Sequence, residues 1–267
     1  MKHQNLILLP GEYAALALYK IYQCGWLRAP ELGRFMYKKD VHASKYAQKL
    51  IQKLVSLRYI LQRKLPGNAG AAYVISARGA AWLNANSTTE QNIYKDNTDW
   101  GRTVEGVWHP PISWIHDLYA LGVLSWLCKE GYAVIPEMTL RRLDPTAKSH
   151  PDGLVIEEGE SSKRWLEVEQ ARKSGKHLEK TIRNLVAAAR GNAVTKYRGI
   201  DIDGAMLAIP AHSVDERGNA VNHLKRIENK IASLRISKTF VIRICLMHIR
   251  GFTVERVEFE DRFFESD

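Results

Sequence analysis

A polar segment at 158–163, between strand-like segments at 154–156 and 165–169, constrains the fold of this chain more than any other feature. It contains Gly and Ser and predicts a turn that pairs the two segments as an antiparallel hairpin. Side chains alternate along a strand with period two, so Glu167 and Glu169 are expected on the same face. The hairpin therefore gathers acidic side chains on one surface.

A third acid, Asp152, stands at the start of the first of these strands. We therefore predict a metal site made by Asp152, Glu167 and Glu169. Mg²⁺ or Mn²⁺ would suit it, because hard cations take one or two carboxylates together with water and phosphate oxygens. Such an ion activates water for attack on a phosphodiester. The alternative is an ordinary surface hairpin in which Pro-Asp-Gly is only a turn former.

Length and composition predict a soluble, globular protein with two domains, because 267 residues exceed one typical domain and 45% of them are hydrophobic. No apolar stretch is long enough to span a membrane, and no secretion signal is visible, so we expect no membrane insertion and a cytoplasmic location. The three cysteines lie far apart and lack the close spacing of zinc ligands. We interpret them as reduced thiols.

The net charge of +10 is concentrated in the N-terminal third of the chain. Residues 1–85 contain thirteen Lys and Arg against three acids, while residues 86–267 contain 26 of each sign. A basic module joined to a neutral one predicts that the first part binds a polyanion, with nucleic acid the leading candidate. An acidic protein partner or a merely solvated basic face are the alternatives.

The first 85 residues predict three short helices, a hairpin and a further helix, an order that resembles a winged helix-turn-helix. In the third helix Tyr46, Leu50, Leu54 and Leu57 have the spacing of a core face, with a lysine stripe opposite them. The predicted elements are helices 11–24, 29–37 and 42–57, strands 58–64 and 72–75, and helix 77–83.

In winged helices the third helix enters the major groove of double-stranded DNA, with its early residues nearest the base edges. Later lysines and the hairpin suit phosphate contacts, because a flexible ammonium neutralises charge without reading sequence. We expect base contacts from His42, Ser44, Lys45 and Gln48, and phosphate contacts from Lys49, Lys53, Arg63 and Lys64.

After a polar linker at 86–110, residues 111–267 predict a mixed sheet flanked by helices, so the fold class is α+β or α/β. Glu137 falls within a predicted strand and could extend the acidic site. The predicted elements are helix 112–129, strand 132–143, the two hairpin strands, helix 175–190, strand 205–209, helix 221–234 and strand 240–249.

The acidic hairpin resembles the PD-(D/E)xK nuclease superfamily, through Pro151-Asp152 followed by Glu167-Val168-Glu169. The resemblance implies a restriction-endonuclease-like domain in which Asp152 and Glu167 hold the metal. Glu169 departs from the family, which usually has Lys at that position, and would act as a third ligand or a general base. Lys173 or Lys176 would supply the missing positive charge, unless each is simply a solvated lysine.

A winged helix followed by "PDG" and "LEVE" looks like the replication-relaxation family and the MobC-type plasmid mobilization relaxases. The resemblance implies an endonuclease that nicks a plasmid transfer origin and works beside other mobilization proteins and a coupling protein. A homodimer is compatible with this interpretation. The alternative is a non-catalytic DNA-binding regulator of replication or transcription, whose nuclease-like domain is degenerate.

Other polar residues near these motifs have ordinary explanations. His116-Asp117 is similar to a phosphohydrolase metal pair but lacks the further ligands, although His116 could assist from a flanking helix. His150 could contact a phosphate, or be a plain turn histidine. Tyr119 and Tyr197 are weak candidates for a nucleophile and are expected to be packing residues.

Overall fold

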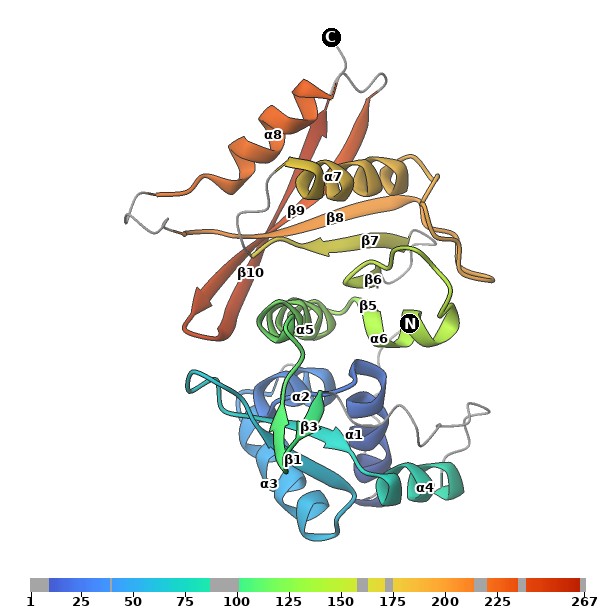
Figure 1. Cartoon of the computed structure of the whole chain (residues 1–267), viewed down its shortest axis with the longest axis vertical. Coiled ribbons are helices and arrows are strands. Elements are labelled where there is room, and N and C mark those ends of the chain that lie inside the picture. Colours follow the sequence, from blue (N-terminus) through green and yellow to red (C-terminus); the bar gives the residue numbers. More distant parts are fainter. Residues whose placement is uncertain are drawn as a thin grey trace. The chain divides into compact units, whose positions relative to one another are not determined.

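The computed structural model describes residues 10–38, 40–86, 101–157, 163–170, 175–213, 220–234 and 239–264. The chain forms two compact units, Met1–Ile112 and Ser113–Asp267 (Figure 1). The fold is α+β, with a mixed six-stranded sheet flanked by helices, as the sequence predicts. Within the described ranges, no helix is long and apolar enough to cross a membrane.

The first unit has the predicted element order of three helices, a two-stranded antiparallel hairpin and a fourth helix. A second short hairpin, β3–β4, lies in the polar segment that the sequence predicts as linker. The elements are α1 (Pro10–Cys24), α2 (Ala29–Tyr37), α3 (Ala43–Ser56), β1 (Ile60–Lys64), β2 (Ala71–Ile75), α4 (Ala77–Asn86), β3 (Arg102–Val104) and β4 (Val107–His109).

The backbone of α2 at Gly33 lies very close to the backbone at the start of α3, because glycine has no Cβ atom to keep them apart. A Cβ atom on Gly33 would lie 2.8 Å from the carbonyl carbon of Ala43 and 2.9 Å from the nitrogen of Ser44. The turn before α3 is held by Asp40, whose Oδ1 accepts a 2.7 Å hydrogen bond from the backbone N–H of His42. The start of α3 is thereby fixed against α2.

The buried face of α3 differs from the predicted one. Tyr46 and Leu57 are 40% and 39% exposed, so their placement in the core is wrong. Small side chains suit a helix that approaches α2 so closely, and the ring of Tyr46 instead packs edge-on against Tyr37. The residues that α3 buries are Ala43, Ala47, Ile51 and Leu54.

A buried ion pair ties α2 to the loop of the β1–β2 hairpin. Arg28 donates from Nη2 to Glu31 Oε1 at 2.7 Å and from Nε to Glu31 Oε2 at 3.0 Å. Its Nη1 donates to the carbonyl of Ala69 in the hairpin loop at 3.2 Å. Glu31 is only 1% exposed, so this carboxylate depends on the guanidinium groups of Arg28 and, at 3.8 Å, Arg34 for its compensation.

The second unit is built on a sheet with strand order β10-β9-β8-β7-β6-β5, in which β7, β8 and β9 run parallel and the other neighbours antiparallel. Helix α5 lies on one face, and α7 and α8 lie on the other (Figure 1). The elements are α5 (Trp114–Lys129), β5 (Ala133–Pro136), α6 (Glu137–Leu143), β6 (Gly153–Ile156), β7 (Lys163–Val168), α7 (Gly175–Ala189), β8 (Gly204–Pro210), α8 (His223–Ser233), β9 (Phe240–Arg250) and β10 (Thr253–Phe264).

One prediction for this unit is wrong, and one strand is not predicted. The strand predicted at 132–143 ends at Pro136, and a helix begins at Glu137. The long edge strand β10 is not predicted, because its many charged residues hide the alternation of a strand.

Glycine also brings α5 close to the sheet. A Cβ on Gly122 would lie 2.8 Å from Val254 Cγ2 on β10, and one on Gly153 would lie 2.8 Å from Leu124 Cδ2 on α5. The Pro-Asp-Gly glycine is therefore a packing position under α5 as well as the first residue of β6.

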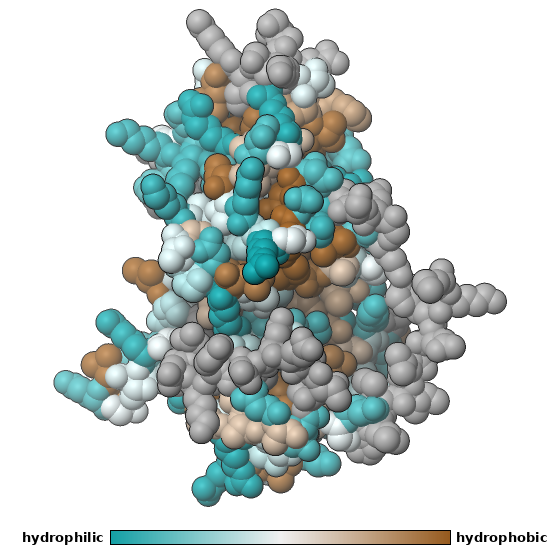
Figure 2. Space-filling view, turned by 90° about the vertical axis from the view of Figure 1, so that its right-hand side faces the viewer, coloured by the Kyte–Doolittle hydropathy of each residue, from teal (hydrophilic) through white to brown (hydrophobic). Residues whose placement is uncertain are grey.

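The surface of the protein mixes hydrophobic and hydrophilic side chains (Figure 2). Among the large hydrophobic residues that are exposed are Ile112 and Phe263.

Candidate active site

The predicted acidic hairpin forms, and it brings Asp152 against the backbone of the Glu-Val-Glu segment. Strands β6 and β7 pair antiparallel with Gly153 opposite Leu166. The backbone N–H of Asp152 donates to the carbonyl of Leu166 at 2.9 Å. Its carboxylate Oδ2 accepts a 2.6 Å hydrogen bond from the N–H of Val168, the residue between Glu167 and Glu169. A charge-assisted bond of this length fixes the carboxylate at the end of β7.

The other oxygen of Asp152 contacts a histidine from α5. Asp152 Oδ1 lies 2.8 Å from His116 Nε2, in a hydrogen bond in which the ring N–H donates to the carboxylate. Asp152 is 8% exposed and the His116 side chain 25% exposed, so the pair is partly shielded from water. His116, which the sequence gives only as a possible assistant, is therefore part of the site.

Glu137 adds a second carboxyl group near Asp152 from the start of α6. Burial raises the pKa of Glu137, and the negative charges of Asp152 and Asp117 raise it further, while Arg141 opposes the shift. The 2.6 Å ion pair between Arg141 Nη2 and Glu137 Oε1 holds the side chain in place. A partly buried carboxyl group with a raised pKa is suited to donate or accept a proton.

Glu167 shares with Trp165 the face of β7 that α7 covers. Its Oε1 accepts a 2.7 Å hydrogen bond from Trp165 Nε1, as expected for residues two positions apart on one face. Trp165 belongs to the core cluster beneath α7 and α8. Glu169 follows the end of β7, is 3% exposed, and donates its backbone N–H to the carbonyl of Ala208 on β8 at 2.8 Å.

The three predicted metal ligands do not form one group in this arrangement. Among the residues that the structure describes, no three His, Cys, Asp or Glu side chains are placed to hold a metal ion together. Asp152 is directed to His116 and Glu167 to Trp165. The donor chemistry nevertheless fits a hard divalent cation, because Mg²⁺ needs only one or two carboxylates and completes its coordination with water and phosphate.

Two lysines are expected to supply the positive charge that Glu169 does not, namely Lys173 and Lys176. Lys173 lies outside the described residues. Lys176 is exposed in the first turn of α7. Gly175 precedes it with a φ of 55°, which starts the helix in a conformation that favours glycine.

The remaining polar candidates make hydrogen bonds within the second unit. His150 Nδ1 lies 2.8 Å from the hydroxyl of Tyr197, which is 4% exposed. Burial and the nearby Arg141 lower the pKa of His150, and burial raises the pKa of Tyr197. Tyr119 donates its hydroxyl to the carbonyl of Gly251 at 3.2 Å.

In the first unit the predicted DNA-contacting residues of α3 share an exposed face. Lys64 on β1 is exposed as well, whereas Arg63 is partly buried, with its guanidinium carbon 5.9 Å from the centre of the Trp108 ring. The exposed residues of the predicted set on α3 and in the turn before it are His42, Ser44, Lys45, Gln48, Lys49 and Lys53.

Comparison with family models, with curated proteins and with solved structures finds no match to this chain.

Proposed function

We propose that this protein binds double-stranded DNA through its first unit and nicks one strand with a divalent-metal site in its second unit. The substrate class is a site-specific DNA duplex, such as a plasmid transfer origin acted on by a mobilization relaxase. Other mobilization proteins and a coupling protein would then be its partners. The proposed location is the cytoplasm, where such DNA is found.

The hydrogen bond from Val168 N–H to Asp152 Oδ2 carries the catalytic part of the proposal. It joins the start of β6 to the end of β7, so the Asp of one strand is held beside the acids of the next. Asp152 and Glu167 would hold Mg²⁺ or Mn²⁺, which when bound supplies an activated water and charge stabilisation on the phosphate.

The chain's own residues have separate roles in this proposal. His116 orients Asp152 by bonding the oxygen that Val168 leaves available. Glu137, whose pKa is raised, is suited to give a proton to the departing oxygen of the cleaved strand. Glu169 would be a third ligand or a base at the end of β7.

The DNA-binding part rests on charge and exposure. Residues 1–85 carry the whole positive excess, and the three lysines of α3, namely Lys45, Lys49 and Lys53, are exposed on one side of the helix. Gly33 fixes this helix against α2, so the lysines are presented on a rigid element. Phosphate contacts from such residues give binding that weakens with salt.

A second function is favoured by the arrangement of the carboxylates. Asp152 is bonded to His116 and Val168, and Glu167 to Trp165, so the acids already have partners within the protein. Glu169 also replaces the family's Lys. These observations favour a DNA-binding regulator of replication or transcription in which the second unit no longer cuts.

One experiment separates the two functions. Supercoiled plasmid carrying the protein's target site is incubated with the protein and Mg²⁺ or Mn²⁺, alongside the Asp152→Ala and Glu167→Ala variants. Relaxed product from the wild type alone supports the nickase. Binding in a gel-shift assay without relaxed product from any of the three proteins supports the regulator instead.

A further inference from the structure

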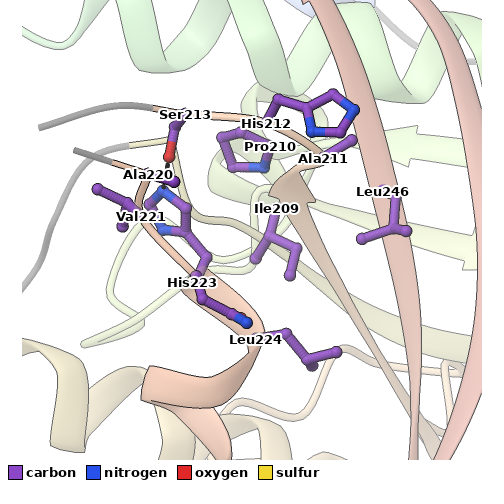
Figure 3. A pocket seen from close by; sticks show the side chains of 11 residues that line it. Ile209, Pro210, Ala211, His212, Ser213, Ala220, Val221, His223, Leu224 and Leu246 are labelled. Carbon is purple, nitrogen blue, oxygen red and sulfur yellow. Dashed lines mark hydrogen bonds between the residues drawn. The ribbon is translucent and has the colours of Figure 1, made fainter. Parts of the chain in front are cut away.

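A pocket of about 640 Å³ lies between the end of β8 and the start of α8, apart from the Asp152 and His116 pair (Figure 3). Its volume is that of a typical small-ligand site. Ile209, Leu224 and Leu246 give it apolar walls. Among the described residues that line it, none carries a carboxylate, an ammonium or a guanidinium group. These apolar walls suit the flat, apolar faces of a ligand.

One polar pair stands at the edge of this apolar pocket. Ser213 Oγ lies 2.7 Å from His223 Nε2, and Figure 3 shows the histidine ring reaching from the start of α8 toward the serine. Burial and the nearby charge of Arg226 lower the pKa of His223, so its ring is neutral at pH 7. A neutral imidazole and a hydroxyl can each donate or accept a hydrogen bond.

The pocket adjoins the strand ends that carry the acids. Glu169 donates its backbone N–H to Ala208, and the next residue of β8, Ile209, is a wall of the pocket. Strands β7 and β8 are parallel, so both end at the same edge of the sheet. Ligands of open α/β sheets bind outside the carboxyl ends of parallel strands.

We propose that this pocket binds one unstacked nucleobase of the DNA strand on which the second unit acts. The faces of the base lie against Ile209, Leu224 and Leu246, and its hydrogen-bonding edge meets Ser213 and His223. Proteins that take a base out of its stack hold it in this way, between apolar side chains and a few polar groups. The identity of the substrate as DNA rests on the proposed function, whereas the binding of a nucleobase rests on the pocket alone.

The test uses the whole protein in EDTA, so that no cleavage takes place. Each of the four deoxynucleoside 5′-monophosphates is titrated while the amide resonances of Ala211, Ser213, His223 and Leu224 are followed by NMR. A single-stranded dodecamer of mixed sequence is titrated in the same way. The variants are Ser213→Ala and the pocket-filling Ala211→Phe. Ser233→Ala, which removes an exposed hydroxyl at the end of α8, is the matched control.

We expect at least one nucleotide and the dodecamer to shift these resonances saturably. Both variants should weaken that binding about tenfold or more, because one loses a partly buried hydrogen-bonding group and the other loses space. Ser233→Ala should leave the binding unchanged. Circular dichroism confirms that each variant is folded. If either pocket variant unfolds, naphthalene is added to the wild-type protein in its place. Naphthalene that binds in the pocket should displace the nucleotide and reverse the same amide shifts.

Each remaining outcome is decisive. No saturable shift with any nucleotide overturns the inference, whether or not the protein nicks plasmid. Shifts with free nucleotides but none with the dodecamer overturn its assignment to a DNA strand. If both the nucleotides and the dodecamer shift the resonances but the protein does not nick plasmid, the nucleobase pocket is supported and only the proposed nicking activity is excluded.

Discussion

His116 and Asp152, 36 positions apart in the sequence, are joined by a 2.8 Å hydrogen bond between α5 and the start of β6. The bond leaves Asp152 held from two sides, because Val168 N–H bonds its other oxygen. A histidine from the helix on one face of the sheet therefore sets the orientation of the central carboxylate.

Replacement of His116 is expected to slow nicking without weakening DNA binding. Without the ring, Asp152 loses one of its two constraints, and a misplaced acid lowers the rate by about 100-fold. His116→Gln, whose amide N–H can still donate to the carboxylate, should recover part of the rate that His116→Ala loses. Rates are measured on plasmid at saturating protein, and affinity by fluorescence anisotropy. Equal rates for wild type and His116→Ala would remove its role in positioning Asp152.

The raised pKa of Glu137 predicts an unusual dependence of stability on pH. In the unfolded chain this carboxyl ionises at its ordinary pKa, whereas in the folded protein it ionises at a higher pH. Its contribution to stability is thus fully present below the unfolded pKa and is lost as pH rises through the folded pKa. Glu137→Gln should therefore gain stability relative to the wild type as pH rises from about 4 toward 7.

Glu179 is the control for this experiment, with the opposite sign. Hydrogen bonds from Arg183 and Lys230 lower the pKa of Glu179, so its contribution is present above the unfolded pKa and lost as pH falls through the folded one. Glu179→Gln should lose stability relative to the wild type over the same pH range. Urea unfolding at several pH values measures both. Parallel pH profiles for the two variants would contradict the raised pKa that burial and the charge of Asp152 give Glu137.

Removal of the carboxylate at Glu31 is expected to destabilise the first unit strongly. Glu31→Gln leaves the buried Arg28 guanidinium without its charge partner, and breaking a buried pair in this way costs about 3–5 kcal/mol. The free energy of unfolding from a urea titration gives the measurement. Glu12→Gln, on the exposed first turn of α1, should change it by less than about 0.5 kcal/mol. A loss below about 1 kcal/mol at Glu31 would show that the pair is not essential to the fold.

Much of the fold follows from local patterns in the sequence. The β6–β7 hairpin is predicted because alternation and a polar turn are both local. Strand β10 is missed because its charges pair across the sheet, as in the 2.9 Å bond from Arg243 Nε on β9 to Asp261 Oδ1 on β10. Its partner lies on another strand, so the pattern within β10 does not show that these charges are paired.

The site is predicted less completely than the fold. The nearness of Asp152 to the Glu-Val-Glu segment follows from strand pairing, but the contact with His116 depends on how α5 packs. That packing depends on Gly153, which sequence alone presents as a turn residue. The buried face of α3 is mispredicted for a similar reason, since a close approach of α2 at Gly33 favours alanine over the larger Tyr46.

Substitution of Lys49 and Lys53 to alanine should weaken binding to double-stranded DNA and flatten its dependence on salt. Each phosphate contact that is lost reduces the slope of log affinity against log salt by about 0.9. Fluorescence anisotropy between about 50 and 200 mM salt measures the slope. Lys20→Ala, which removes one charge from α1, should leave the slope unchanged. A double variant with the wild-type slope would exclude α3 as the DNA-contacting helix.

The most direct test of metal-dependent nicking measures the rate at which supercoiled plasmid is nicked in Mn²⁺. It compares substitutions of two aspartates from the loop before β6, Asp152 and Asp144. Asp152→Asn keeps the shape of the side chain and can still accept from Val168 N–H, but it loses the charge that a cation requires. Asp144→Asn changes a half-buried residue whose carboxylate accepts hydrogen bonds from the neighbouring Thr146 and Ala147. We predict that Asp152→Asn lowers the rate by about 100-fold or more while Asp144→Asn leaves it unchanged. Equal nicking by wild type and Asp152→Asn, or none by the wild type, would contradict the assignment of this site as a nuclease centre.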